Sequence, residues 1–403
     1  MARTNISEHT PHGGIARLKP FSIPLLSYGF RPFFLGAAVW ACVAMVLWIG
    51  LLTGTWSFAN SYGALAWHAH EFLFGYVSAV LTGFLLTAIP NWTGRMPLQG
   101  WPLLGLVVLW LAGRTAMLVT DQIGNLPAMA IDVAYLVMLT AAIAREIIAG
   151  KNWRNLKVTL LVGLIVIANI AFHLEVLRTG APDHGMRLAI TAVVALIILV
   201  GGRVTPSFTH NWLARTGDPK RPASMGRFDF VSIGIMAVAL VSWVAAPRWQ
   251  GTALLLFAGA VAQAVRLMRW AGARTWREPI VFVLHLGYAF VPMGAFLLGV
   301  SILWPATVSQ TAALHAWTTG AIGVMTLAVM TRATLGHTGQ SIMTSPTTLI
   351  IYSGIMIAAC ARIIAGFEPG LEILYLSAIG WLVAYVSFVI DYGPLLVRAR
   401  RAN

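Results

Sequence analysis

The chain has 403 residues, of which 58% are hydrophobic and only 10% are charged, and its formal net charge is +14. Soluble proteins carry charged side chains at about a quarter of their positions, so this composition excludes an ordinary soluble domain. The two cysteines stand in no CxxC or CxxCH spacing, which excludes a disulfide framework and covalently attached c-type haem.

Twelve apolar segments follow one another along the chain, each near the roughly 20 residues that a membrane-spanning helix needs. The sequence therefore predicts an all-α, polytopic membrane protein with one membrane domain over 33–390. A cytoplasmic N-terminal tail is expected over 1–32 and a basic cytoplasmic C-terminal tail over 391–403. The predicted helices are 33–53, 66–89, 101–119, 127–149, 157–178, 186–202, 229–246, 251–270, 279–303, 308–331, 347–366 and 371–390.

Basic residues are distributed unevenly between the two sides of this topology. Most of the 27 lie in the tails and alternate connections, whereas the other side holds only Arg178, Arg187 and Arg248. The positive-inside rule then places both termini in the cytoplasm. The net charge is attributed to this topology and to contact with anionic lipid. Nucleic-acid binding is not expected, because the basic residues are scattered and no known nucleic-acid motif accompanies them.

Histidines form two predicted layers, one near each membrane face. The outer layer holds His68, His70, His173, His184 and His315, and the inner layer holds His210, His285 and His337. Ionisable groups in spanning helices are costly and are functional candidates by default. Imidazole commonly binds haem iron, copper and zinc. The layers fit two metal or haem sites, or one site and a proton path, although a single histidine often only hydrogen-bonds a neighbouring helix.

The segment "LAWHAHEFLFGY" (65–76) concentrates ionisable groups at the start of the second helix. His68 and His70 point about 200° apart on a regular helix, so they cannot both bind one metal there. Glu71 shares the face of His68. One assignment makes His70 a ligand, with His68 and Glu71 as a polar support or proton relay, and the reverse assignment stays open. Asn169, one turn before His173, is its expected hydrogen-bond partner.

Two arginines and one aspartate lie within predicted helices. Arg114 and Asp132 are both placed toward the outer ends of neighbouring helices and are expected to pair with each other. The alternative is that Arg114 or Arg362 neutralises haem propionates, which need cations when buried.

A weak internal repeat relates the second, sixth and tenth helices. An offset of 245 residues places His70 on His315 and Thr93-Gly94 on Thr338-Gly339, and an offset of 129 places Arg203 on Arg332 and Thr209 on Thr338. The repeat predicts three four-helix units in which His70 and His315 flank a common ligand. The inner polar stretches that contain Arg203, His210, Arg332 and His337 are either loop caps or a site for an anion, a quinone head group or haem propionates.

Several motifs resemble the NnrS family, namely "YGFRPFFLGA" (28–37), "WHAHEFLFGY" and "GFLLTAIPNWTG" (within 67–94), "LWLAGR" (109–114), "GRVTPSFTHNWL" (202–213) and "HAWTTGAIGVMTLAVMTRATLGHTG" (315–339). The resemblance covers about 20–390. It implies a polytopic bacterial inner-membrane protein with haem b and copper, linked to denitrification and relief of nitric oxide stress. Its motifs carry over His68, His70, Glu71, Arg203, His210, His315, Arg332 and His337 as candidate site residues; His173 and His285 join them from their depth.

The leading hypothesis is a haem- and copper-dependent membrane protein of nitric oxide metabolism or resistance, with its metal site near the periplasmic face. A reductase would need protons, for which His68 and Glu71 are the candidate catalytic groups, and an electron donor such as quinol. Two alternatives stay open. One is a proton-coupled secondary transporter that uses the same histidines, and the other is a non-catalytic haem protein that senses nitric oxide or protects other proteins from it.

Overall fold

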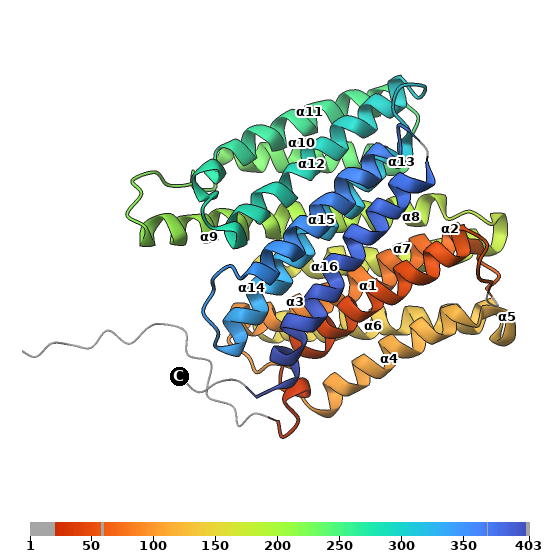
Figure 1. Cartoon of the computed structure of the whole chain (residues 1–403), viewed down its shortest axis with the longest axis horizontal. Coiled ribbons are helices and arrows are strands. Elements are labelled where there is room, and N and C mark those ends of the chain that lie inside the picture. The colour runs from red at the N-terminus through yellow and green to blue at the C-terminus, as the bar shows by residue number, and fades with distance from the viewer. Residues whose placement is uncertain (1–20, 58–59, 369, 400–403) are drawn as a thin grey trace, which may run out of the picture.

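The computed structural model describes residues 21–57, 60–368 and 370–399. Within these residues the protein is built of helices, with no β-strand. All twelve predicted crossings are present as apolar helices long enough to span a bilayer, which confirms the all-α polytopic membrane fold. Figure 1 shows them as a bundle in which consecutive helices run back and forth between two ends.

Three of the twelve crossings are composite and contain a π-helical segment. The helices of the first third of the chain are α1 (Phe30–Leu52), α2 (Gly63–His70), η2 (Glu71–Val77), α3 (Ser78–Thr93), α4 (Trp101–Leu118), α5 (Thr120–Ile123) and α6 (Asn125–Ala149). The next are α7 (Leu156–Thr179), α8 (Asp183–Leu196), η4 (Ile197–Gly201), α9 (Gly202–Arg215), α10 (Arg227–Ala245) and α11 (Gln250–Met268). The last are α12 (Pro279–Leu303), α13 (Gln310–His315), η6 (Ala316–Gly323), α14 (Val324–Thr338), α15 (Pro346–Ile364) and α16 (Leu371–Val397). Short 3-10 turns are η1 (Pro24–Leu26), η3 (Trp153–Asn155) and η5 (Gly272–Thr275).

The inner polar stretches are helical, contrary to their prediction as loops. The sixth and tenth crossings were expected to end at 202 and 331, but α9 and α14 continue to Arg215 and Thr338. Threonine hydroxyls in these turns bond back to the helix, as Thr338 Oγ1 does to the Thr334 carbonyl at 2.7 Å. His210 and His337 therefore lie within helices and not after them.

The chain ends also differ from prediction. The helix α16 continues to Val397, so the expected tail over 391–403 begins with helix. Residues 1–20 and 400–403, which include most of the expected N-terminal tail, lie outside the described residues.

The 245-residue offset is confirmed at several helix boundaries. The π-helical segments η2 and η6 begin at Glu71 and Ala316, which are 245 residues apart. The helices α3 and α14 both end on a left-handed glycine, Gly94 with φ of 69° and its equivalent Gly339 with φ of 77°. The neighbouring helices α4 and α15 also start 245 residues apart, at Trp101 and Pro346. The first and third groups of four crossings are thus structural repeats of each other.

The 129-residue offset finds no such support. It pairs Thr209 with Thr338, but Thr338 is the last residue of α14, whereas α9 continues past Thr209 to Arg215. The middle group of helices therefore follows a different spacing from the other two.

The composite crossings are more deeply buried than most of the other helices. The most apolar stretches of Gly63–Thr93, Asp183–Arg215 and Gln310–Thr338 are 78%, 61% and 72% buried, whereas that of α10 is only 33% buried. Of the other crossings only α12, at 67%, falls in this range. The segment η2 and His70, which precedes it, consequently lie inside the protein, whereas His315 before η6 is partly buried.

The last helix packs against the first, which joins the third repeat to the first one. Figure 1 shows α16 beside α1. Trp381 Nε1 donates to the Ala41 carbonyl at 3.1 Å. The Arg31 guanidinium donates to carbonyls at the end of α16, among them Leu396 at 2.9 Å, and so satisfies groups that the helix end leaves free.

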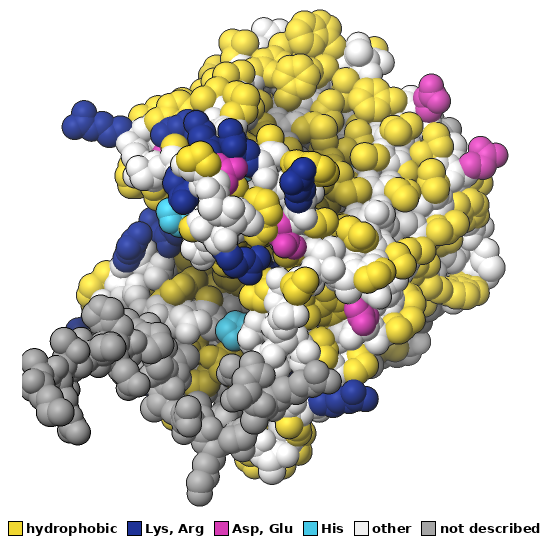
Figure 2. Space-filling model, turned by 60° about the vertical axis from the view of Figure 1, so that its left-hand side comes forward, with side chains coloured by type: hydrophobic (Ala, Val, Ile, Leu, Met, Phe, Trp, Pro, Cys, Tyr) yellow, Lys and Arg dark blue, Asp and Glu magenta, His cyan; other side chains and the backbone are white. Residues whose placement is uncertain are grey.

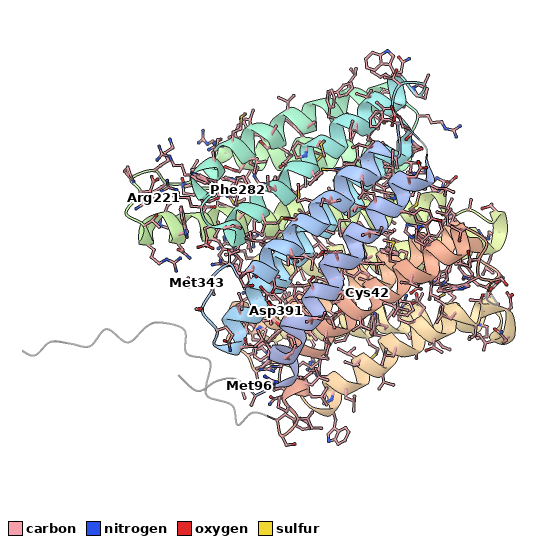
Figure 3. The ribbon with its side chains drawn as sticks, in the orientation of Figure 1. Cys42, Met96, Arg221, Phe282, Met343 and Asp391 are labelled. Carbon is pink, nitrogen blue, oxygen red and sulfur yellow. The ribbon has the colours of Figure 1, made fainter. Side chains whose placement is uncertain are left out.

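One end of the bundle carries most of the charge. Met96, Arg221 and Met343, from three different connections, lie toward this end in Figure 3, whereas Cys42 lies midway along the bundle. Figure 2 turns this end toward the viewer and shows Lys and Arg side chains gathered over it. The charge separation expected from the sequence thus exists in the fold, and the cytoplasmic assignment of this basic end stays a prediction.

Candidate metal centre

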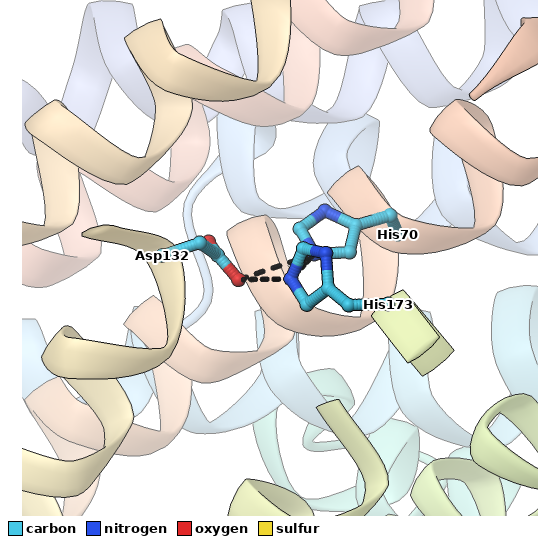
Figure 4. A group of neighbouring side chains, drawn as sticks. All are labelled: His70, Asp132 and His173. Carbon is cyan, nitrogen blue, oxygen red and sulfur yellow. Dashed lines mark hydrogen bonds and ion pairs between the residues drawn. The ribbon is translucent and has the colours of Figure 1, made fainter. Parts of the chain in front are cut away.

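Three buried side chains from three helices converge away from the basic end of the bundle. They are His70 at the end of α2, Asp132 on α6 and His173 on α7 (Figure 4). His70 Nε2 lies 3.2 Å from Asp132 Oδ2 and 3.3 Å from His173 Nε2. His173 Nε2 lies 3.2 Å from the same carboxylate oxygen. The three atoms form a nearly equilateral triangle, and all three residues are 1% exposed or less.

Glycines allow the helices that carry this cluster to approach closely. A Cβ on Gly113 of α4 would lie 3.0 Å from Asp132 Oδ1 and 3.2 Å from the Asp132 Cα. A Cβ on Gly75 in η2 would lie 2.6 Å from an Arg114 nitrogen and 2.9 Å from Glu71 Oε2. The Gly75 carbonyl accepts a hydrogen bond from Trp110 Nε1 at 2.9 Å, so this buried π-helical backbone stays satisfied.

Each imidazole is held through its other ring nitrogen. Glu71 Oε1 lies 2.9 Å from His70 Nδ1, and the Tyr62 hydroxyl lies 2.6 Å from His173 Nδ1. A carboxylate can only accept, so with a metal on Nε2 the proton of His70 lies on Nδ1 and is donated to Glu71. Ligating histidines almost always have such a partner on the second nitrogen, which orients the ring.

The carboxylates are held in the same way. Arg114 donates to Glu71 Oε2 at 2.6 Å and also to Asp132 Oδ1, and its side chain is buried with both. Asn169 Nδ2 donates to Asp132 Oδ2 at 2.7 Å. With neutral histidines, two carboxylates and one guanidinium leave a net charge of one negative unit inside the membrane domain. A buried charge of this kind requires a proton or a cation beside it.

The donor set and the spacing fit a transition metal. Imidazole nitrogens and carboxylate oxygens bind zinc at about 2.0–2.2 Å, and tetrahedral bonds of that length place neighbouring ligand atoms about 3.3 Å apart. The observed separations of 3.2, 3.2 and 3.3 Å match this value. Two histidines and one carboxylate leave a coordination position open, as in catalytic metal sites. The arrangement can therefore hold copper, iron or zinc and present it to a small ligand.

Tyr62 is the least expected member of the cluster. It lies just before the second crossing and is only 4% exposed. Burial, and then the negative charge of Asp132, raise the pKa of Tyr62. The phenol therefore stays neutral at physiological pH, and it can accept the proton of a metal-bound His173 at Nδ1.

The structure changes several predicted partnerships. Arg114 does pair with Asp132, as expected, but both belong to the metal cluster. Asn169 contacts Asp132, so its predicted bond to His173 is wrong. Glu71 contacts His70 and Arg114, and not His68, which was expected to share its face.

His68 and His315 lie apart from the three-residue cluster. The His68 ring stacks on Trp48 with centroids 4.1 Å apart. His315 Nδ1 donates to the Thr311 carbonyl at 2.8 Å, one turn earlier in its own helix. His70 makes its contacts with Glu71, Asp132 and His173, so the structure does not bring His70 and His315 together around a common ligand.

The inner candidates occupy separate environments. His285 Nε2 bonds Thr209 Oγ1 at 2.7 Å, and the His337 ring lies 5.4 Å from that of Phe30. His210 is exposed. Arg203 donates to Asn155 Oδ1 at 3.1 Å, and the Arg332 guanidinium lies 3.8 Å from the centre of the Phe208 ring. Among the described residues these groups form no cluster with metal-ligand spacing.

Sequence reasoning missed Asp132 as a ligand and Tyr62 as a partner. Asp132 was treated only as the partner of Arg114, although it is an acid in a spanning helix at the depth of His70 and His173. That coincidence of depth was the available signal. The sequence holds no such signal for Tyr62, because its position in the connection before α2 gives no indication of which helix it contacts.

Comparison with known families agrees with the motifs. The NnrS protein family profile matches residues 24–400, which is nearly the whole chain. No curated protein matches the chain. The match spans every crossing, including the three helices that supply His70, Asp132 and His173. The chain belongs to the NnrS family.

Proposed function

We propose that this protein binds nitric oxide at a copper ion held by His70, Asp132 and His173 within the membrane. The convergence of three buried ligand atoms in a triangle of 3.2–3.3 Å carries this proposal. The resemblance to the NnrS family supplies the identity of the metal and of the ligand. The geometry supplies the site, its open coordination position and its burial.

Charge supports copper in its lower oxidation state. The cluster of Glu71, Asp132 and Arg114 has a net charge of one negative unit when the histidines are neutral. A monovalent cuprous ion makes the site neutral, whereas a divalent ion leaves one positive charge in a medium that stabilises charge poorly. Imidazole suits copper, zinc and iron alike, so charge is the property that separates them here.

The membrane domain also contains an apolar cavity that suits a small neutral ligand and that none of the three metal ligands lines. An apolar cavity of about 100 Å³ lies among the composite crossings, lined by Val77, Val80, Leu81, Phe84, Leu85, Val193, Leu196, Ile197, Val200, Gly201, Val204, Ile322, Met325, Thr326 and Val329. Val77 ends the π-helical segment that Glu71 begins. Nitric oxide is neutral and lipid-soluble, so it can enter such a space directly from the bilayer. Dry apolar cavities of this size take up small apolar molecules.

Haem is the second cofactor in this proposal, as the family resemblance implies. The Thr311 carbonyl holds the proton of His315 on Nδ1 at 2.8 Å, which leaves the Nε2 lone pair free to bind iron. His315 therefore fits the chemistry of an axial ligand. A bound haem would supply an iron that binds nitric oxide.

The test is metal analysis of the purified protein, combined with absorption and electron paramagnetic resonance spectra before and after nitric oxide is added. We expect stoichiometric copper in the wild type, loss of copper in His70→Ala and His173→Ala, and retention in His210→Ala, whose exposed side chain lies far from the cluster. Steady-state consumption of nitric oxide would show turnover. A colourless, metal-free wild type would refute the proposal and favour a proton-coupled transporter.

A further inference from the structure

The third repeat contains a counterpart of the metal centre from which both acids are missing. The 245-residue offset pairs Glu71 with Ala316 and Asp132 with Ser377. Ser377 is 5% exposed, and its hydroxyl donates to the Ala358 carbonyl at 2.9 Å. The helices that carry these residues correspond, since α6 starts at Asn125 and α16 at Leu371. The scaffold is therefore repeated, whereas its negative charges are not.

A cation is nevertheless retained at this level. Arg362 lies on α15, the counterpart of α4, which carries Arg114 in the first repeat. The two arginines differ by 248 residues, so Arg362 stands about one helical turn from the position equivalent to Arg114. It is partly buried.

Close contacts between helices place Arg362 opposite His315. A Cβ on Gly366 would lie 2.5 Å from the Ala312 Cβ, and a Cβ on Gly323 would lie 3.3 Å from Ile355 Cδ1. Ala312 and Gly323 lie before and after His315 in one crossing, and Ile355 and Gly366 lie before and after Arg362 in the antiparallel one. The register therefore brings the guanidinium to the level of the imidazole, and the charge of Arg362 acts on His315.

His68 reaches the same place from the second crossing. The Tyr76 hydroxyl lies 2.6 Å from Thr326 Oγ1, so the second and tenth crossings are neighbours that run in the same direction. This alignment puts His68 at the depth of His315 and Arg362. His68 Nδ1 is buried and has no hydrogen-bond partner within the described residues.

The resulting cluster of His68, His315 and Arg362 lacks a counter-charge. Arg114 pairs with two carboxylates, but no ion pair or hydrogen bond joins Arg362 to another described residue. The nearest acids along the chain, Glu368 and Glu372, are exposed and make no ion pair there. Arg362 lies in the last turn of α15, where the helix C-terminus favours a cation, but no carboxylate pairs with it, and a positive charge within a membrane domain is costly without one. A ligand with one negative charge would remove that cost.

We propose that Arg362 and His68 form a second binding site beside His315, which takes an anionic carboxylate or a small oxyanion. The planar guanidinium suits two-pronged binding of either group. The orphaned His68 Nδ1 can add one hydrogen bond. The anion is either the carboxylate of a bound cofactor, such as a haem propionate, or a free ion. This site does not depend on the metal centre of the first repeat.

Two variants test the site without relying on one another. Arg362→Gln removes the cation, and Ser377→Asp restores an acid at the position that corresponds to Asp132. Both should abolish binding, the second because an internal carboxylate replaces the ligand. Arg269→Gln is the matched control, since it removes a partly buried arginine whose partner is Asp229, at 3.5 Å, and which belongs to neither site. Binding is measured by calorimetric titration of nitrite and by the haem content of the purified protein, read from its Soret absorbance.

The outcomes separate the two sources of the anion. Nitrite binding that both variants lose and the control keeps identifies a free anion. Haem content that both variants lose, with no nitrite binding in the wild type, identifies a cofactor carboxylate. If both variants match the wild type in nitrite affinity and haem content, or if the wild type binds neither, the proposal is overturned. Copper content should stay at the wild-type level in both variants, so failure of the metal centre would be seen separately.

Discussion

The hydrogen bond between Tyr62 and His173 gives a sharp test of the metal centre. The substitution Tyr62→Phe removes one hydroxyl and keeps the ring, so the buried packing of this side chain is preserved. Its oxygen lies 2.6 Å from His173 Nδ1, on the side of the imidazole opposite the proposed metal. Loss of such a supporting partner typically lowers metal affinity 10- to 100-fold. We expect a loss of about 1.4–2.7 kcal/mol in binding free energy.

The assay is competition for cuprous ion against a coloured chelator in detergent solution. Tyr135→Phe is the matched control, because Tyr135 is a fully buried tyrosine of α6 that bonds Thr82 Oγ1 at 2.5 Å and touches none of the three ligands. Its affinity for copper should equal that of the wild type. An unchanged affinity in Tyr62→Phe would show that His173 does not bind the metal through Nε2, and the proposed coordination would then be wrong.

Three further predictions concern the surroundings of the cluster. Arg114→Gln leaves two buried carboxylates without a cation and should lower the unfolding free energy by about 3–5 kcal/mol, measured by denaturation in mixed micelles. The control is Arg95→Gln, which breaks the exposed pair with Glu146 and should lower the unfolding free energy by less than about 1 kcal/mol. Gly75→Ala should reduce copper content because its Cβ would lie 2.6 Å from an Arg114 nitrogen, whereas Gly105→Ala on α4, with open space around it, should not. Val200→Phe should fill the apolar cavity and abolish xenon binding observed by nuclear magnetic resonance, and Val108→Phe on an exposed face should preserve it.

The crossings could be read from the sequence because bilayer thickness fixes their length. Their inner ends could not, since the stretch after 202 is polar and yet helical to Arg215. Beyond the hydrocarbon core, polarity no longer opposes a helix, and threonine hydroxyls are satisfied within it by carbonyls one turn earlier, as Thr209 is at 2.9 Å. Hydrophobicity therefore marks where the membrane ends better than it marks where a helix ends.

The depth of the site residues in the membrane could be predicted from the sequence, whereas their contacts with one another could not. Charge distribution placed His70, His173 and Asp132 at one level, and the structure brings all three together. Their pairings depend on helix rotation, which the sequence does not give when π-helical segments interrupt the regular period. The segment η2 begins immediately after His70 and changes the angular relation between its two flanking helices. Glu71, at the junction, contacts His70 and Arg114, although regular spacing assigned it to the face of His68.

The repeat explains how one scaffold can hold ligands of opposite charge. In the first repeat the acids outnumber the arginine, so the imidazoles of His70 and His173 face a site that attracts a cation. Alanine and serine replace the acids at the equivalent positions of the third repeat, and Arg362 lies about one helical turn from the position that corresponds to Arg114. His315 therefore faces a site that attracts an anion. Both sites follow a histidine at the start of a π-helical segment in a deeply buried crossing. The charge of the neighbouring helices, α4 and α6 in one case and α15 and α16 in the other, thus determines what each histidine can bind.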